Sequence, residues 1–220
     1  MAEEFLDKVL HDENVKLNHV LHLGAEWAQE TEVYNKYGAE HVYWVEPILQ
    51  NRSIAEYHYL SKAKFEWTFI PSAVADENKN SVFYLYNHQS ANSLFKPDRM
   101  NVYYPGHKVA SQVLVRCNTL DTIFDEFEVD YKKINLLCMD IQGAEMMALN
   151  YAHQLLKSPL LKYICAEVVW EPLYKDGCLK SEIDNLLAEY KFFPKYEEQH
   201  NPTYEGIKEV PQSDIMYVRV

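Results

Sequence analysis

The sequence has few glycines, only four cysteines, and no long apolar or basic run. Six glycines and nine prolines among 220 residues exclude a collagen-like or linker-dominated chain. The cysteines form no CxxC pair and match no zinc-site spacing, so buried free thiols in a reducing compartment are expected. No apolar stretch approaches the roughly 20 residues that span a bilayer, and the acidic amino terminus does not resemble a signal peptide. We therefore expect a cytoplasmic protein with no membrane partner.

The chain is acidic. It has 21 basic and 33 acidic residues, for a formal net charge of −12. Because affinity for nucleic acid comes mostly from neutralising phosphates with Lys and Arg, general nucleic-acid binding is not expected. Hydrophobic residues make up 48% of the chain, which suits one globular domain over residues 1–220, with a helical extension over residues 1–18.

Apolar segments of strand type alternate with segments of helix type. This alternation predicts parallel strands with crossover helices, hence an α/β sheet. The expected strands are 19–23, 41–46, 134–141 and 163–170, and the expected helices are 25–37, 48–60, 144–156 and 181–190, the last with Ser181 as its N-cap. The segments 195–200 and 214–220 are expected to form a closing hairpin.

The middle of the chain is different. The segments 65–71, 81–86 and 109–116 look like strands without helices between them, so residues 81–116 are interpreted as an insertion of strands and a long loop. The loop, 87–107, is long for a compact domain, and such loops are often functional. We expect it to cover a site or to contact a substrate; the alternative is an ordinary surface excursion.

Acidic and small residues follow the expected parallel strands, at the edge where ligands bind in open α/β sheets. From this position we expect cofactor-binding roles for Gly24, Ala25, Glu26, Glu46, Pro47, Ser72, Ala73, Asp140 and Gln142. Glu46 has the most specific predicted role among these residues, because a carboxylate about 20 residues after a glycine turn suits hydrogen bonds to a ribose diol. The alternative is a helix N-terminal acid beside Pro47.

The glycine turn at residues 24–30 has one glycine instead of GxGxxG, and Glu26 would repel a phosphate. A cofactor with a ribose but no phosphate fits better than a dinucleotide. S-adenosylmethionine is such a cofactor, and acidic residues can stabilise its sulfonium cation.

The segment 140–145 (DIQGAE), followed by an amphipathic helix, resembles the D-[VI]-[EQ]-G-x-E signature of the FkbM-type S-adenosylmethionine-dependent methyltransferases. Other segments resemble that family in the expected order, and the resemblance spans about residues 20–193. These segments are the turn 23–30, the strand 37–47, the segment 72–74, the loop 90–97 and the region from Glu167 to Gly177. Within the turn, Glu26 and Ala28 stand where the family usually has His and Gly, and Ala28 is expected inside the start of a helix.

The resemblance implies a class I (Rossmann-like) methyltransferase fold, which is a seven-stranded, mostly parallel sheet with helices on both faces. It also implies methyl transfer to a hydroxyl oxygen of a sugar, another glycan or a small metabolite. His22 stands where such enzymes often carry an acid, and it could bind the methionine carboxylate of the cofactor if it is protonated.

Direct methyl transfer depends mainly on proximity, assisted by a base near the acceptor. We take Asp140, Glu167 and His88 as the candidate catalytic residues. Candidate substrate residues lie in the long loop and after the fifth parallel strand: Asn92, Ser93, His107, Trp170 and Glu171. No metal site is predicted, because the spacing of Asp140, Glu145 and Glu167 is not diagnostic, and Glu145 is interpreted as a helix N-terminal acid.

Three other functions stay open at this stage. A non-catalytic domain that binds a ligand on the same fold is the main alternative, and the altered turn at 24–28 supports it. An NAD-dependent oxidoreductase is disfavoured by the missing GxGxxG, and an RNA methyltransferase by the net charge. The sequence leaves the oligomeric state open.

Overall fold

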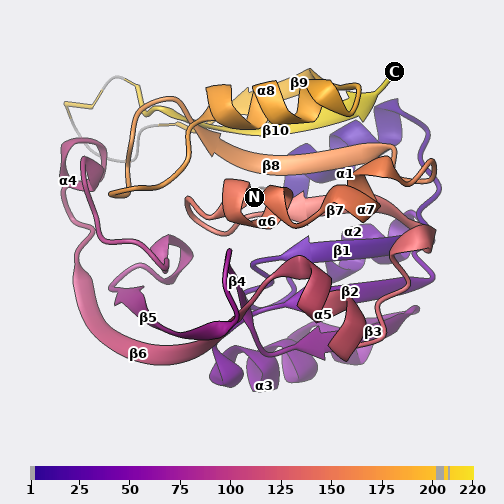
Figure 1. Ribbon diagram of the computed structural model, residues 1–220, viewed down its shortest axis with the longest axis horizontal. Helices are drawn as coiled ribbons and strands as arrows, with labels where there is room; N and C mark the ends of the chain where they lie inside the picture. Colours follow the sequence, from indigo (N-terminus) through magenta and orange to yellow (C-terminus); the bar gives the residue numbers. More distant parts are fainter. Residues whose placement is uncertain (1–2, 202–205, 208) are drawn as a thin grey trace.

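The computed structural model describes residues 3–201, 206–207 and 209–220. Its main sheet has seven strands in the order β3-β2-β1-β7-β8-β10-β9 (Figure 1). All neighbours from β3 to β8 pair in parallel, and β10 runs antiparallel to both β8 and β9. The strands are β1 (His19–Leu23), β2 (His41–Val45), β3 (Glu66–Ile70), β7 (Ile134–Met139), β8 (Tyr163–Val169), β9 (Phe192–Gln199) and β10 (Gln212–Arg219).

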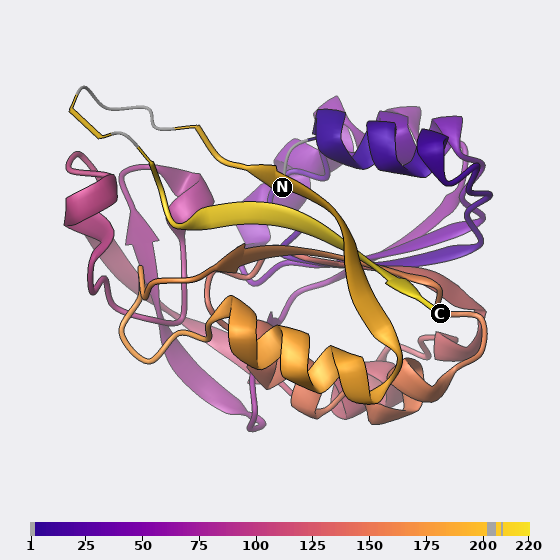
Figure 2. The same ribbon diagram turned by 90° about the horizontal axis from the view of Figure 1, so that it is seen from above.

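Helices cover both faces of this sheet (Figure 2). One face carries α1 (Glu3–Asp12), α2 (Thr31–Lys36) and α3 (Leu49–His58), and the other carries α5 (Leu120–Glu126), α6 (Glu145–Asn150), α7 (His153–Lys157) and α8 (Lys180–Glu189). The core is accordingly divided by the sheet into two large apolar clusters. The central strand β7 is buried at every position, as a parallel strand covered on both faces must be. The predicted class I methyltransferase fold is confirmed.

A second, three-stranded sheet lies where the insertion is predicted. Its order is β4-β6-β5, with bounds β4 (Ala73–Val74), β5 (Lys79–Tyr86) and β6 (Val109–Asn118). The long loop between β5 and β6 contains a short 3₁₀ helix, η2 (Gln89–Ala91), and the one-turn helix α4 (Met100–Tyr103). Figure 1 shows this sheet and α4 beyond the carboxyl ends of the parallel strands. The insertion therefore stands over the edge where a ligand is expected.

Some local predictions were wrong. The expected helix over 25–37 begins only at Thr31, because Glu26 and Ala28 adopt positive φ angles of 44° and 61° and so cannot continue a helix. The expected helix over 144–156 is divided into α6 and α7. Helix α8 begins at Lys180, with Leu179 in the N-cap position instead of Ser181. Helix α5 and the short 3₁₀ helices η1 (Leu60–Lys62) and η3 (Tyr131–Lys133) were not predicted.

The amino-terminal helix belongs to the core. Helix α1 buries Phe5, Leu6, Val9 and Leu10, which pack in the same cluster as Val20 of β1. Burying four such side chains contributes several kcal/mol of hydrophobic stabilisation. Within the described part of the chain, none of the helices has the length and apolar character needed to cross a bilayer.

Candidate functional site

A cavity of about 540 Å³ opens at the carboxyl ends of β1, β2 and β7. We call it the first cavity. All nine residues expected to bind the cofactor lie in its wall: Gly24, Ala25, Glu26, Glu46, Pro47, Ser72, Ala73, Asp140 and Gln142. They meet because parallel strands end at one edge of the sheet. Their assignment to cofactor binding stays a prediction.

Glu46 closes the turn after β1 from the end of β2. Its Oε2 accepts the backbone N–H of Glu26 at 3.1 Å, and its Oε1 accepts the backbone N–H of Ile48 at 2.8 Å. The side-chain amide of Asn51 donates to the same Oε1 at 3.3 Å. The carboxylate is thus a fixed acceptor at the cavity wall. Burial raises its pKa to about 7 in spite of these donors.

The wall of the first cavity is acidic. Among the described residues, it contains no Lys or Arg, whereas six carboxyl groups line it: Glu3, Glu4, Glu26, Glu30, Glu46 and Asp140. Glu30 is only 6% exposed, and its Oε2 has no hydrogen-bond partner among the described residues. Burial raises the pKa of Glu30 to about 7. Such a wall favours a cationic ligand and disfavours a phosphate.

The DIQGAE segment forms a tight turn between β7 and α6. Glu145 is buried, and its carboxylate accepts the backbone N–H groups of Ile141 at 3.2 Å and of Gly143 at 3.1 Å. Cys178 donates its thiol to the same carboxylate. Glu145 therefore holds the turn at the start of α6, in agreement with its interpretation as a helix N-terminal acid. Gln142, with φ of 51°, is turned so that its side chain reaches the cavity wall.

A second cavity, of about 720 Å³, adjoins the first. Among the residues that the structure describes, the two walls share Ser90, Asp140 and Gln142. The second cavity lies between the insertion and the carboxyl-terminal hairpin, because Tyr104 and Gln212 also line it, and the Tyr104 hydroxyl donates to the Gln212 side chain at 2.6 Å. A cofactor in the first cavity and an acceptor in the second would meet at Asp140 and Gln142.

The amide of Gln142 connects two carboxylates at this junction. Its Nε2 donates to Asp140 Oδ1 at 2.7 Å and to Glu167 Oε1 at 2.6 Å, and its Oε1 accepts the hydroxyl of Tyr174 at 2.7 Å. Burial, together with the nearby Asp140 carboxylate, raises the pKa of Glu167 to about 8. Glu167 can therefore gain or lose a proton near neutral pH.

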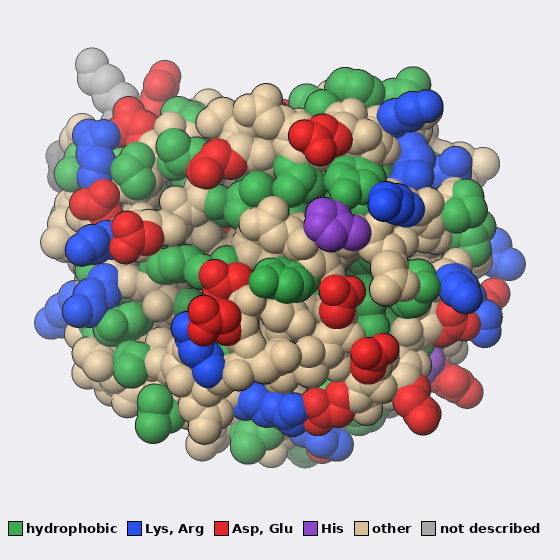
Figure 3. All heavy atoms as spheres, in the orientation of Figure 1, with side chains coloured by type: hydrophobic (Ala, Val, Ile, Leu, Met, Phe, Trp, Pro, Cys, Tyr) green, Lys and Arg blue, Asp and Glu red, His purple; other side chains and the backbone are tan. Residues whose placement is uncertain are grey.

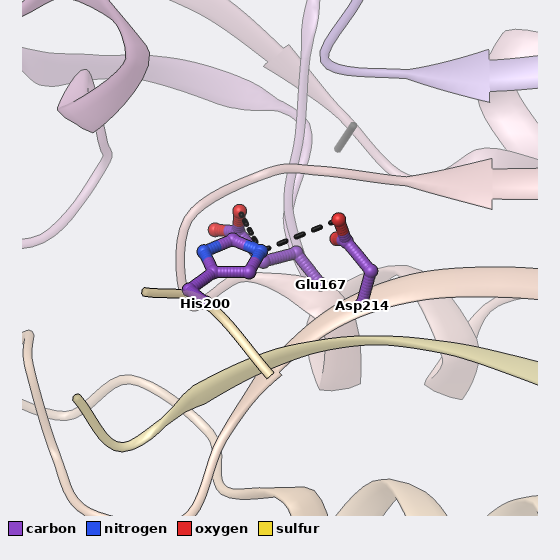
Figure 4. Close-up of side chains that lie close together, drawn as sticks. All are labelled: Glu167, His200 and Asp214. Atoms are coloured by element: carbon purple, nitrogen blue, oxygen red, sulfur yellow. Dashed lines mark ion pairs between the residues drawn. The ribbon is translucent and has the colours of Figure 1, made fainter. Parts of the chain in front are cut away.

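Side chains from β8, from β10 and from the residue after β9 point toward one another (Figure 4), and all three line the second cavity. The imidazole Nε2 of His200 lies 3.3 Å from Asp214 Oδ2 and 3.9 Å from Glu167 Oε2. Asp214 on β10 is the register partner of Glu167 on β8, so the two carboxylates stand side by side. Burial by itself lowers the pKa of His200, but the Asp214 and Glu167 carboxylates raise it above its usual value.

The residues expected to contact the substrate lie in different places relative to the two cavities. His88 and His107 line the second cavity, with ring centroids 4.1 Å apart. Asn92 lines the first cavity instead, where its Oδ1 accepts the backbone N–H of Tyr86. Ser93 is fully buried and donates its hydroxyl to the backbone carbonyl of Gln142 at 2.7 Å, which joins the insertion to the DIQGAE turn.

Trp170 and Glu171 line neither cavity. The Glu171 carboxylate forms an ion pair with Arg99 and accepts the hydroxyl of Tyr103 at 2.6 Å. It thereby ties α4 to the segment after β8, which is a structural use of the side chain. Trp170 is 41% exposed.

The idea that His22 binds the cofactor was wrong. Its side chain is buried under Tyr34 and Trp44, and its Nδ1 hydrogen-bonds the Tyr34 hydroxyl at 2.8 Å. Burial lowers the pKa of His22 to about 3, so a protonated imidazole is not available there.

Sequence reasoning missed several wall residues. Asn51, in the first turn of α3, was not predicted although it contacts Glu46, and Glu30 was predicted only as part of the turn 23–30. His200 and Asp214 carry no sequence signal of a site, because they lie on the closing hairpin and reach the cavity only through strand pairing. Tyr174 was not predicted as a site residue, although its hydroxyl donates to the side chain of Gln142.

Solved structures with the same fold were found at low sequence identity. A candidate RNA methyltransferase of Pyrococcus horikoshii superposes with a TM-score of 0.53 at 10% identity, covering 99% of this chain and 83% of that one. Magnesium protoporphyrin IX methyltransferase of Synechocystis, solved with bound S-adenosylmethionine, gives a TM-score of 0.52 at 10% identity, covering 99% and 78%. Its complex with S-adenosylhomocysteine gives 0.52 at 9% identity, covering 99% and 82%. These likenesses concern the fold.

No curated protein matches the chain. The family described as the methyltransferase FkbM domain matches residues 18–203, which include the β1 turn, Glu46 and the whole DIQGAE segment. The chain therefore belongs to the methyltransferase FkbM domain family.

Proposed function

We propose that this protein is an S-adenosylmethionine-dependent methyltransferase that methylates a hydroxyl oxygen of a sugar or another small metabolite. The observation that carries the proposal is the junction of the two cavities. Asp140 and Gln142 belong to both walls, so a donor in one cavity and an acceptor in the other would face each other across them.

The first cavity fits S-adenosylmethionine, the cofactor that the family and the fold support. Its acidic wall matches the cofactor's two cationic groups, the sulfonium and the α-amine. Glu46 stands at the end of β2, where its carboxylate can accept from a ribose diol while it holds the Glu26 amide. When bound, the cofactor supplies an electrophilic methyl group.

The residues around the second cavity would orient the acceptor and take its proton. Asp140, Glu167 and His88 are the candidate catalytic residues, and all three line this cavity. Glu167 is one candidate for the proton acceptor, because burial raises its pKa to about 8, and a base works best when its pKa is near the working pH. Gln142 fixes its orientation by donating to Oε1.

A small acceptor is favoured over RNA. Among the described residues, the wall of the second cavity contains no Lys or Arg, and an RNA backbone would need such groups. On the face shown in Figure 3, Lys and Arg side chains are scattered among Asp and Glu instead of forming one basic patch. His107, Tyr104 and Gln212 offer the mixture of rings and polar groups that a sugar or an aromatic alcohol would use.

Calorimetric titration with S-adenosylmethionine and S-adenosylhomocysteine tests the proposal. We expect micromolar binding of both by the wild type and a loss of at least about tenfold in Glu46→Ala, which corresponds to one hydrogen-bonded carboxylate. Glu56→Ala is the matched control, since the partly exposed Glu56 on α3 lies outside the wall of the first cavity and forms an ion pair with Arg52. If neither ligand binds the wild type, the methyltransferase proposal fails, and a non-catalytic domain becomes the better account.

A further inference from the structure

The second cavity contains a set of potential metal ligands that the sequence did not predict. Glu167, His200 and Asp214 each offer one ligand atom, and these three atoms lie within 4.8 Å of one another. They come from β8, from the residue after β9, and from β10 (Figure 4). Their positions are fixed by the ladder hydrogen bonds of these strands, and the backbone N–H of His200 still donates to the carbonyl of Gln212 at 2.9 Å.

The distances between the groups suit one ion. Two ligands each about 2 Å from a divalent metal are roughly 3 to 3.5 Å apart. His200 Nε2 is already 3.3 Å from Asp214 Oδ2 and 3.9 Å from Glu167 Oε2. Small side-chain rotations would therefore complete a three-ligand face.

The placement of the carboxylates gives a second reason. Glu167 and Asp214 are directly opposed across the β8–β10 ladder, and like charges so placed destabilise a sheet. Asp214 is 1% exposed and the Glu167 side chain 10% exposed, so water screens the repulsion poorly. The imidazole of His200 lies against both carboxylates. A metal ion bound by all three groups would supply the positive charge there, with His200 neutral.

The surroundings orient the ligands and leave room for a further one. Gln142 donates to Oε1 of Glu167, which leaves Oε2 directed toward His200. Such an outer hydrogen bond is the usual support of a ligating carboxylate. The three groups form part of the wall of the second cavity, so the remaining coordination positions of an ion would face the space assigned to the acceptor.

We propose that Glu167, His200 and Asp214 bind one divalent first-row transition-metal ion in the wall of the second cavity. One imidazole and two carboxylates match the preferences of ions such as Mn²⁺. The ion would be a Lewis acid toward the acceptor oxygen, a role that rests on the proposed function. With the ion bound, Glu167 is a ligand, and the proton of the acceptor would go to Asp140 or His88, which line the same cavity. Metal binding itself does not depend on that function.

Mn²⁺ titration of the full chain, followed by electron paramagnetic resonance, tests the site. After dialysis against a chelator, the wild type should bind one Mn²⁺ per chain at micromolar concentration. Pulsed spectra should show coupling to one histidine nitrogen. His200→Gln should abolish that coupling and weaken binding about 100-fold, and Asp214→Asn and Glu167→Gln should each weaken it at least about tenfold.

His88→Gln is the matched control, because His88 lines the same cavity outside the three-residue set. It should keep both the affinity and the nitrogen coupling. Thermal melts without metal identify any variant that fails to fold, and the wild-type titration alone still decides whether an ion binds.

The proposal would be overturned if the wild type binds no stoichiometric Mn²⁺ at about 1 mM, which is roughly the dissociation constant of the weakest specific metal sites. A nitrogen coupling that survives in His200→Gln or disappears in His88→Gln would also overturn it. The three groups would then be an ordinary ion pair between strands. Since the titration contains no cofactor, its failure is distinguishable from a failure of the methyltransferase proposal, which the calorimetry measures separately.

Discussion

A β-carbon on Gly24 would lie 1.9 Å from the backbone carbonyl oxygen of Asp140. The ends of β1 and β7 approach this closely because the Asp140 N–H donates to the carbonyl of Leu23 at 2.9 Å. Gly24 also has φ of 84°, a conformation that side chains disfavour. The contact fixes the position of Asp140 relative to the β1 turn, and hence the shape of the first cavity.

Gly24→Ala should therefore be severely destabilising. We expect a loss of about 3 kcal/mol or more of unfolding free energy, from the steric clash added to the backbone strain. Gly38→Ala is the control, since Gly38 also has a positive φ of 68° but no atom within 4 Å of an added β-carbon; it should lose only about 1 kcal/mol. Urea denaturation measures both. Equal losses in the two variants would show that the close approach to Asp140 contributes nothing.

Glu30→Gln should raise stability and lower cofactor affinity. Because Glu30 is buried with one unpartnered oxygen among the described residues, its ionised form is unfavourable, and removing the charge should add about 1 to 3 kcal/mol at pH 8. The same change removes a counter-charge for the cationic cofactor, so affinity for S-adenosylmethionine should fall about tenfold. Calorimetry and urea unfolding measure the two effects. Glu32→Gln, at an exposed position of α2, should change neither.

The stability of the fold should decrease as pH rises above 5.5. Burial raises the pKa of Glu30, Glu46 and Glu145 to about 7, and that of Glu167 to about 8. Each carboxyl binds its proton more tightly in the folded than in the unfolded chain. The stabilisation is complete below pH 4.5 and is lost as pH rises through 7 to 8.

The free energy of unfolding, measured by urea denaturation between pH 5.5 and pH 8.5, should therefore fall by an amount on the order of a few kcal/mol in total. Glu46→Gln should flatten part of this slope. A stability that stays constant or rises over this range would show that these carboxyl groups are not held in poorly solvated sites.

Gln142→Glu should destabilise the junction of the two cavities. The side-chain amide of Gln142 donates one hydrogen bond to Asp140 and one to Glu167. A carboxylate in its place would add a third negative charge and would have no N–H group to donate. We expect a loss of about 1 to 3 kcal/mol at pH 8 and a smaller loss at pH 5.5, where protons can be shared. Gln29→Glu, at an amide that donates to one carboxylate, should lose less. A pH-independent effect of Gln142→Glu would contradict the electrostatic explanation.

The expectations that held came from local sequence patterns with one dominant physical cause. The nearly continuous apolar run at 134–141 predicted a strand covered on both faces, and the observed strand spans Ile134–Met139. Glu46, Asp140 and Gln142 were predicted at one edge because parallel strands end together. The turn after β1 was not predictable in the same way. Ala28 adopts a left-handed conformation that its residue type does not indicate, and the surrounding contacts decide it.

Local patterns in the chain were enough to predict the fold family, the edge of the sheet at which the site lies and the acidic character of the cavity wall, because periodicity, composition and a contiguous motif are local properties. Which polar groups meet depends on the packing of the whole fold. In the folded protein, His22 is buried away from the cavity, and Glu171 forms an ion pair with Arg99. Asp214 lies opposite Glu167 in the sheet, with His200 beside them. These outcomes depend on strand register and side-chain direction between segments distant in the chain. They follow from packing the whole molecule, which no short window of sequence contains.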